Sequence, residues 1–282
     1  MDKWDVSDRL TEFLNEDVGS GDITSAITPN IRVRAEILST SNGYISGVEE
    51  THILFHLKDV AAKSHVNDGE RVRRRQRIFT LNGMSRDILL VERTALNLLS
   101  RMSGITTLTR KYANALRKMR SNALIVATRK TTPGFRHFEK KAVVLGGGLP
   151  HRMGLYDMIL LKDNHLAVFG KDVKKAVLAA RGSKTKAKVE IEVFTVGEAL
   201  SAAESQADMI MFDNMEPKEI RKAIRLMAKK GIRKGIILEA SGGISLRNLR
   251  RYARTGVDWI STGRLTHSAE ALDFTLEILP PK

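Results

Sequence analysis

The 282-residue sequence contains no cysteine. A chain without thiols has no disulfide framework, no thiolate zinc site, no iron–sulfur cluster and no cysteine nucleophile. It also lacks any run of about 18 apolar residues, so the sequence predicts no transmembrane helix. The first ten residues, MDKWDVSDRL, lack the apolar core of a secretory signal. We therefore expect a cytoplasmic protein.

Aromatic residues are also scarce, at 5%, which is little for a protein that stacks single-stranded bases. Positive charge is in excess, because 47 Lys and Arg against 32 Asp and Glu give a formal net charge of +15. Such an excess attracts nucleic acid, acidic membrane surfaces, or small phosphorylated and carboxylated substrates. The densest basic run follows a turn-like Asn67-Asp68-Gly69, and we interpret it as a solvated hairpin rim: Arg71, Arg73, Arg74, Arg75 and Arg77.

The chain is long enough for one large or two modest domains, and its two halves have different patterns. Residues 30–83 are β-type, with short apolar stretches separated by turn dipeptides, and residues 88–118 have helical spacing. After residue 122, apolar strand-like segments alternate with helical ones. The expected strands are 123–129, 158–165, 188–193, 209–214, 235–240 and 257–262, and the expected helices are 138–147, 171–181, 195–205, 216–231 and 245–255.

A series of β–α units with short apolar strands predicts a parallel sheet with helices outside it. The repeat length favours a (β/α) barrel over an open sheet. No GxGxxG motif follows the first strand, which makes a dinucleotide-binding fold less favoured. In a parallel barrel the working residues lie at the carboxyl ends of the strands, and here those ends are polar or glycine-rich. They are Arg129-Lys130, Lys162 to His165, Glu190 and Glu192, Asp213-Asn214, Ser241-Gly242-Gly243 and Thr262-Gly263.

Two of these residues, Glu190 and Glu192, alternate with apolar neighbours, so we expect both to point into the barrel. Buried carboxylates are costly unless they are paired or near a metal. With Asp213 they could hold a hard cation such as Mg²⁺, through water or substrate oxygens. Internal ion pairs with Lys130 or Lys162 are the alternative.

Two glycine-containing loops, Ser241-Gly242-Gly243 and Ser261-Thr262-Gly263, each precede an expected helix at the last two strand ends. Barrels tend to bind phosphate at these positions with backbone N–H groups.

The stretch between residues 128 and 165 concentrates cations that suit carboxylates and phosphates. Of its histidines, we expect His137 and His165 to be structural, and His151 could also be a core residue. The cations form a pocket for a phosphorylated sugar and a carboxylated small molecule: Arg129, Lys130, His151, Arg152 and Lys162.

At these residues the sequence resembles the quinolinate phosphoribosyltransferases. The matching stretches run along almost the whole chain: EDVGSGDIT (16–24), ERTALNLLSRMSGITTLT (92–109), TRKTTPGF (128–135), GGGLPHRMGLYDMILLKDNH (146–165), VEIEV (189–193), MFDN (211–214), LEASGGI (238–244) and ISTGRLTHS (260–268).

The resemblance implies an α/β protein with two domains. A small N-terminal α/β sandwich domain over 1–109, completed by 268–282, would join an incomplete (β/α) barrel over 110–267. It implies a homodimer or hexamer in which the N-terminal domain of one subunit caps the barrel of another. The implied reaction joins quinolinate to 5-phosphoribosyl 1-pyrophosphate (PRPP), giving nicotinate mononucleotide, pyrophosphate and CO₂ for NAD synthesis.

The resemblance also implies roles for individual residues. Lys130, Glu192 and Asp213 would be catalytic, with Lys130 meeting PRPP and pyrophosphate. Glu192 and Asp213 would meet the ribose hydroxyls and Mg²⁺, the metal indirectly through PRPP or water. The quinolinate-facing cations would be Arg129, His151, Arg152 and Lys162, with Arg93 from the neighbouring subunit, and the remaining substrate contacts would be Thr128, Ser241, Gly242, Gly243, Thr262 and Gly263.

Three other hypotheses stay open at this point. Pro150 before His151 resembles a family branch associated with molybdenum uptake, which would act on another carboxylated base, although Lys162 to His165 are intact here. A Schiff-base aldolase would use Lys162 as its nucleophile. A nucleic-acid-binding module would use Arg71 to Arg77, but carboxylates between the barrel-end cations would repel a phosphate backbone. We therefore regard a membrane or nucleic-acid partner as disfavoured.

Overall fold

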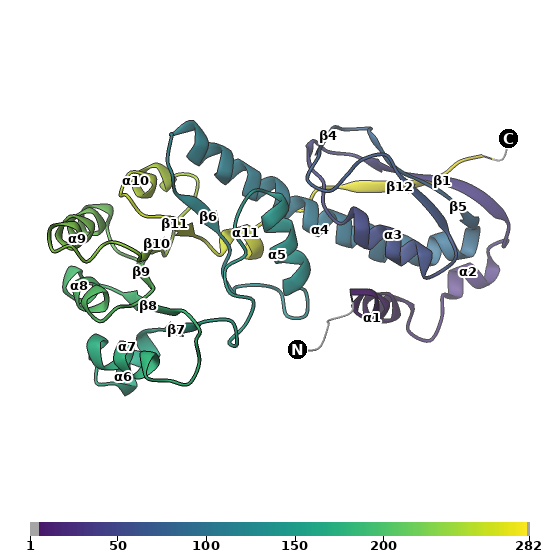
Figure 1. Cartoon of the computed structure of the whole chain (residues 1–282). Helices are drawn as coiled ribbons and strands as arrows, with labels where there is room; N and C mark the ends of the chain where they lie inside the picture. Colours follow the sequence, from purple (N-terminus) through teal and green to yellow (C-terminus); the bar gives the residue numbers. More distant parts are fainter. Residues whose placement is uncertain (1–5, 281–282) are drawn as a thin grey trace. The chain divides into compact units, whose positions relative to one another are not determined.

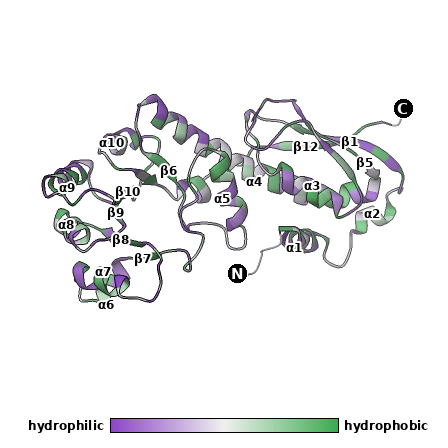
Figure 2. Cartoon of the chain, in the orientation of Figure 1, coloured by the Kyte–Doolittle hydropathy of each residue, from purple (hydrophilic) through white to green (hydrophobic). Residues whose placement is uncertain are grey.

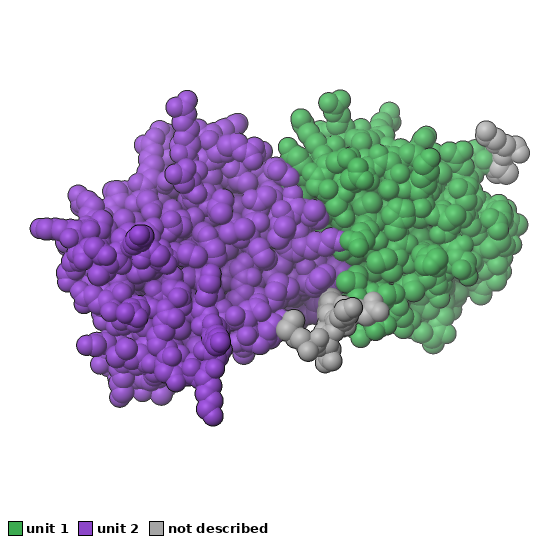
Figure 3. Space-filling view, viewed as in Figure 1, with its two compact units in different colours: residues 1–108, 269–282 green, residues 109–268 purple. Residues whose placement is uncertain are grey.

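The computed structural model describes residues 6–280. The chain forms two compact units, residues 1–108 with 269–282 and residues 109–268 (Figure 3). Each boundary is one residue away from the expected domain boundary. That the two units are independently folding domains stays a prediction. Residues 1–5 and 281–282 lie outside the described residues. Both ranges belong to the expected first domain, and residues 1–5 also belong to the segment searched for a secretory signal. In the described part of the chain, no helix is long and apolar enough to cross a membrane.

The first unit contains a four-stranded antiparallel sheet in the order β12-β1-β5-β3, with α1 and α3 packed against each other (Figure 1). Strand β12 pairs with β1 from Ala35 opposite Ile278 to Ser39 opposite Phe274, so the C-terminal segment completes this sheet, as expected. The elements are α1 (Val6–Val18), α2 (Ile23–Ile27), β1 (Arg32–Ser39), β2 (Gly43–Tyr44), α3 (Val48–His56), β3 (Ala61–Ser64), β4 (Arg71–Val72), β5 (Arg77–Met84) and β12 (Phe274–Ile278). Helix α4 (Ser85–Lys118) contributes residues to both units.

The expectation of β-structure throughout 30–83 is wrong for α3. Gly47, at φ 99°, precedes the helix in a left-handed conformation, and two glutamates occupy the first turn, where the helix dipole favours negative charge. Val48, Leu54 and Phe55 are buried along one face. Apolar residues six and seven positions apart can belong to one helix or to two short strands, so the pattern alone did not distinguish a helix from strands.

The Asn67-Asp68-Gly69 turn does not close a hairpin, contrary to our interpretation. Strand β3 pairs with β5, whereas β4 pairs with β2. The arginines are solvent-exposed as expected, and the only one with an ion pair among the described contacts is Arg77, whose Nε lies 2.9 Å from Oε1 of Glu36.

The second unit is built on a six-stranded parallel sheet in the order β6-β11-β10-β9-β8-β7. The edge strands β6 and β7 do not pair in the described structure, so the parallel barrel is incomplete, and the predicted fold class is confirmed. The elements are β6 (Leu124–Val126), α5 (Arg136–Leu145), β7 (Ile159–Leu161), α6 (Asp163–Val168), α7 (Val173–Arg181), β8 (Val189–Val193), α8 (Val196–Glu204), β9 (Met209–Asp213), α9 (Pro217–Lys229), β10 (Ile237–Ser241), α10 (Leu249–Ala253), β11 (Trp259–Ser261) and α11 (Arg264–His267).

The strand register brings the carboxyl ends of β8, β9 and β10 to one edge of the sheet. Val193 lies opposite Phe212, and Asp213 lies opposite Ser241. The helices outside the sheet bury an apolar face. In α9 this face includes Ile220 and Met227, and the alternating colours of α9 in Figure 2 show the amphipathic pattern. The polar strand ends therefore gather in one region, as the β–α pattern predicted.

Two details of the expected elements are wrong. The strand expected over 158–165 ends at Leu161, because α6 begins at Asp163 and the Nδ1 of His165 accepts a hydrogen bond of 3.1 Å from the backbone N–H of Lys162. The helix expected over 245–255 is shorter, since α10 spans only Leu249–Ala253. His165 thus has the structural role that we expected, at the start of a helix.

Helix α4 contains Gly104, where a Cβ atom would overlap the backbone carbonyl oxygen of Glu270 and approach Cα of Ala271 to 3.0 Å. Gly-to-Ala changes inside helices usually stabilise by about 1 kcal/mol. Because the C-terminal segment occupies this space, we expect Gly104→Ala to destabilise the protein by about 1–3 kcal/mol instead. Thermal unfolding measures the effect.

The matched control is Gly182→Ala, since Gly182 ends α7 at φ −75° and its Cβ would approach no atom more closely than 3.4 Å. We expect little change for this variant. A melting temperature that is unchanged or raised by Gly104→Ala would contradict the close packing at Glu270.

Candidate active site

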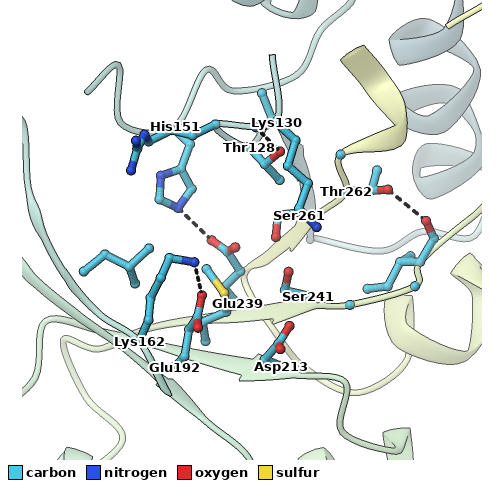
Figure 4. A pocket seen from close by; sticks show the side chains of 18 of the residues that line it. Thr128, Lys130, His151, Lys162, Glu192, Asp213, Glu239, Ser241, Ser261 and Thr262 are labelled. Atoms are coloured by element: carbon cyan, nitrogen blue, oxygen red, sulfur yellow. Dashed lines mark hydrogen bonds and ion pairs between the residues drawn. The ribbon is translucent and has the colours of Figure 1, made fainter. Parts of the chain in front are cut away.

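A cavity of about 610 Å³ lies at the carboxyl ends of the parallel strands (Figure 4). Every predicted site residue of the second unit lines it, although these residues are far apart in the sequence. They are Thr128, Arg129, Lys130, His151, Arg152, Lys162, Glu192, Asp213, Ser241, Gly242, Gly243, Thr262 and Gly263. Arg93 belongs to the first unit, where it is exposed on α4, and its contribution to a neighbouring subunit stays a prediction.

One wall of the cavity carries an ion pair between strand ends. The Nζ of Lys162, just after β7, lies 2.6 Å from Oε1 of Glu192 on β8. Burial raises the pKa of Glu192, and the Lys162 ammonium offsets part of this rise. The internal ion pair that we considered for Glu192 is therefore present. Asp213, at the end of β9, accepts a hydrogen bond of 3.0 Å from the side chain of Asn214.

Glu190 has a different partner from the one considered. It points into the barrel as predicted, but it is fully buried and contacts His151 rather than a lysine. The Nε2 of His151 lies 3.4 Å from Oε2 of Glu190 and 3.2 Å from Oε2 of Glu239. Glu239, on β10, is also fully buried. Two carboxylates thus share one imidazole inside the barrel.

The His151 ring is fixed by contacts on both of its nitrogens. Its Nδ1 accepts a hydrogen bond of 2.8 Å from the backbone N–H of Arg152, and its face meets Trp259 edge-on with ring centroids 5.7 Å apart. Because Nδ1 accepts, the ring proton of the neutral form lies on Nε2, facing the carboxylates. A direct contact between a His151 nitrogen and a substrate carboxylate would require the ring to turn.

His151, Glu190 and Glu239 have the composition of a metal site, with ligand atoms within 4.8 Å of one another. The described hydrogen bonding argues against this use. A metal needs the lone pair on Nε2, but with Nδ1 accepting the Arg152 N–H, that nitrogen carries the proton. We therefore interpret the three side chains as an ion cluster.

At Gly242 and Gly263, one glycine of each loop, an added Cβ would have close neighbours. Gly242 has φ 91°, and a Cβ there would overlap the Asn214 side chain and lie 2.7 Å from its backbone nitrogen. At Gly263 a Cβ would lie 2.9 Å from the side chains of Lys130 and His267. Thr262 donates a hydrogen bond of 2.9 Å to the carbonyl of Ile244, which ties the two loops together.

Several cavity residues were missed from the sequence. Glu239 gave a usable signal, since it alternates with apolar residues on β10 as Glu190 and Glu192 do on β8. Arg264 and His267 gave none, because the four-residue helix α11 that carries them has no recognisable period. Asp163 was noted only as part of a polar strand end. All four line the cavity.

The buried ion cluster predicts a pH dependence of stability. Burial and the Glu239 charge raise the pKa of Glu190 above its ordinary value. Burial lowers the pKa of His151, but the two carboxylates outweigh that effect and raise it overall. A raised pKa in the folded state gives stability that is complete below the unfolded-state pKa and is lost as pH rises through the folded-state pKa.

We therefore expect the free energy of unfolding to fall between pH 5 and pH 9. Glu190→Gln, which cannot ionise, should make this fall shallower by up to about 1.4 kcal/mol per pH unit. Urea unfolding at several pH values measures the slope. Glu204→Gln, in an exposed ion pair with Lys230, is the control. Equal slopes for wild type and Glu190→Gln would contradict the buried ionisation.

Comparisons with known proteins agree with this geometry. Family models for the quinolinate phosphoribosyl transferase N-terminal and C-terminal domains match residues 22–103 and 105–277. The chain is 44% identical to a probable nicotinate-nucleotide pyrophosphorylase (carboxylating) of Archaeoglobus fulgidus, over 92% of this chain and 98% of that protein. It is 39% identical to the Bacillus subtilis protein of the same name, over 95% and 92%.

Solved structures agree with both the sequence and the fold. NadC from Streptococcus pyogenes superposes with a TM-score of 0.89 at 36% identity, covering 99% of each chain. The nicotinate-nucleotide pyrophosphorylase of Francisella tularensis gives 0.89 at 33% identity, covering 97% of this chain and 96% of that one. The resemblance found in the sequence is confirmed, and the chain belongs to the quinolinate phosphoribosyltransferase family.

Proposed function

We propose that this protein transfers the phosphoribosyl group of PRPP to quinolinate and releases CO₂, giving nicotinate mononucleotide and pyrophosphate for NAD biosynthesis. The observation that carries this proposal is the composition of one cavity. Arginine and lysine side chains, a carboxylate corner and two glycine loops all line it. Membership of the family supports the same reaction.

Quinolinate carries two neighbouring carboxylates, which guanidinium groups can bind in a bidentate geometry. Arg129 and Arg152 line the cavity together with Lys162. Burial lowers the pKa of Arg152, and Arg129 lowers it further, but the group stays charged in proteins. Glu190, Glu192 and Asp157 offset part of the charge on Arg152, and a bound dicarboxylate would relieve the remaining repulsion between the two arginines.

PRPP would lie with its 5′-phosphate at the glycine loops and its reactive carbon near the carboxylates. Backbone N–H groups at Gly242, Gly243 and Gly263 are suited to phosphate oxygens. Lys130 packs against the Gly263 position, so its ammonium can reach the pyrophosphate. Glu192 and Asp213, on neighbouring strand ends, would face the ribose hydroxyls.

Ribosyl transfer passes through an oxocarbenium-like state while pyrophosphate leaves. The quinolinate nitrogen forms a bond to C1′ as the bond from C1′ to the pyrophosphate oxygen breaks. Lys130 would stabilise the leaving charge, and Glu192 and Asp213 would stabilise the positive ribose. The ring nitrogen is then cationic and stabilises the carbanion left when the adjacent carboxylate departs as CO₂. A proton from water adds to this carbon, which completes nicotinate mononucleotide. No covalent enzyme intermediate is needed.

Mg²⁺ is part of the proposal as a companion of PRPP, whose pyrophosphate charge it would neutralise when bound. The carboxylates of Glu192 and Asp213 are the hard oxygen ligands that Mg²⁺ prefers. One oxygen of Glu192 is already held by Lys162, at 2.6 Å. The fit is therefore to an ion held through PRPP or water rather than by a closed protein cage.

The decisive experiment is a product assay with purified protein, PRPP and Mg²⁺, offering quinolinate and nicotinate in parallel. We expect CO₂ and nicotinate mononucleotide from quinolinate alone, and no turnover once EDTA removes the metal. Turnover of nicotinate without CO₂ would contradict the proposed substrate. If PRPP binds but neither substrate reacts, the molybdenum-associated branch with another carboxylated base becomes the better assignment, and Pro150 the residue to examine.

In the same assay, Arg152→Ala and Lys162→Ala should each lose roughly 10²-fold or more in kcat/KM, because each removes a charge that the substrate would neutralise. Arg181→Ala is a suitable control, since Arg181 pairs with Asp208 on the surface at 2.8 Å. Near-normal kinetics for both site variants would contradict the assigned cavity.

We also propose that the protein acts as a homodimer or hexamer in which Arg93 completes the site of a neighbouring subunit. Arg93 is exposed on α4. The first unit also exposes large apolar side chains close together in sequence, with Ile23 and Ile27 each 86% and Ile31 55% exposed. Exposed apolar clusters of this kind are typical of surfaces that a partner covers. The cytoplasmic location stays a prediction.

Mixing two inactive variants tests this arrangement. Arg93→Ala would disable the site of the partner subunit, and Lys130→Ala would disable the site of the subunit that carries it. In a mixed dimer both changes fall on the same site, so the other site stays intact. After subunit exchange of equal amounts, we expect about a quarter of wild-type activity from a twofold dimer. Arg93→Ala mixed with itself is the control. No recovery in an exchanged mixture, or full activity of Arg93→Ala alone, would contradict the shared site.

A further inference from the structure

Lys140 is the only lysine that is buried within the described residues, at 1% exposure. It lies on α5, and it is not one of the residues lining the cavity. Its Nζ donates hydrogen bonds to the backbone carbonyls of Pro150 and Arg152, the first at 2.5 Å. The ammonium therefore bridges the carbonyl groups of the two residues on either side of His151.

The bridged segment needs such support. His151 has φ 54°, a left-handed conformation that costs a non-glycine residue roughly 1–2 kcal/mol. On its other side, the segment is held by the hydrogen bond from Arg152 N–H to the His151 ring and by the ring's contacts with Glu239 and Glu190. Lys140 supplies the contact from the α5 side.

This segment also sets the direction of Arg152. The guanidinium Nη1 of Arg152 donates a hydrogen bond of 3.3 Å to the carbonyl of Met158, and the side chain lines the cavity. Since the Arg152 carbonyl is one of the two groups that Lys140 holds, a change at Lys140 alters the backbone from which this cation projects.

The surroundings of Lys140 are unfavourable to a cation. Burial and the nearby Arg136, Arg129 and Arg152 together lower its pKa to about 8, although Asp157 acts in the opposite direction. An apolar side chain of similar length would avoid this electrostatic penalty. The contacts that offset this penalty are the two hydrogen bonds from the ammonium to the carbonyls of Pro150 and Arg152.

We propose that Lys140 is a positioning residue, which fixes the backbone of residues 150–152 and so aims the Arg152 guanidinium at the carboxylated substrate. This inference rests on the proposed function. Lys140 does not touch substrate in this arrangement, and it acts through the two carbonyls that it binds. Its loss should affect quinolinate much more than PRPP, whose predicted contacts lie on other strand ends.

The test compares Lys140→Met with Lys141→Met, the same substitution one position along α5. We expect Lys140→Met to raise the KM for quinolinate about tenfold or more while the KM for PRPP changes less than about threefold. Its melting temperature should be no higher than that of the wild type, because two backbone carbonyls lose their donor. Lys141→Met should keep both constants. Lys140→Gln, which keeps one donor group without the charge, should lie between Lys140→Met and wild type.

Calorimetric binding of phthalate separates this inference from the proposed reaction. Phthalate has two adjacent carboxylates but no ring nitrogen, so it can bind the cation pocket but cannot react. Weaker phthalate binding by Lys140→Met, with wild-type PRPP binding, supports the positioning role even if no quinolinate reacts. Equal changes in the constants for quinolinate and PRPP, or unchanged phthalate binding, would overturn it. If Lys140→Met does not fold, Lys140→Gln is judged by the same criteria.

Discussion

The placement of carboxylates inside an apolar barrel is the constraint on which the rest of the site depends. Glu190, Glu192 and Glu239 project from β8 and β10 into the barrel interior, where each is buried and poorly solvated by water. Each buried anion needs a cation or a proton within contact distance. Lys162 meets Glu192 at 2.6 Å, and His151 meets the other two. The residues that supply these partners are therefore fixed in place by electrostatics as much as by packing.

This constraint passes from the strands to the loop that carries His151. To place its ring over the two carboxylates, His151 adopts a positive φ, and its neighbours' carbonyls turn toward α5, where Lys140 receives them. The ring that satisfies the buried anions thus leaves Arg152 facing the cavity. His151 of the ion cluster and Arg152, the proposed substrate-binding cation, are consecutive residues of one strained segment, so a change at either residue affects the other.

The sequence predicted the parallel fold and the polar strand ends because both depend on local periodicity. Apolar alternation in VEIEV was enough to turn Glu190 and Glu192 inward. The partners could not be predicted in the same way, since whether Glu190 meets a lysine or a histidine depends on which loop reaches the barrel interior. The helix α3 was missed because five buried positions in nine residues do not distinguish a short helix from strands.

Lys140 shows a different limit. It is followed by Lys141 in α5, and a helical period does not say which of two adjacent lysines is buried. Only the position of the 150–152 backbone decides this, and that position depends in turn on His151 and the barrel carboxylates. Functional residues of this kind have no signature of their own in a single sequence, because their role is defined by backbone groups that any residue would present.

The two demands on the 150–152 segment also oppose each other. Burial of the ammonium beside three arginines lowers folding stability, although its two hydrogen bonds to backbone carbonyls restore part of this loss. Substrate binding favours the ammonium, because two backbone carbonyls held on one point charge cannot rotate independently, and Arg152 then presents its guanidinium at a fixed angle. An anion site built from cations must be assembled before the anion arrives. Repulsion among these cations destabilises the empty site, and the carboxylates of the barrel interior offset part of that repulsion.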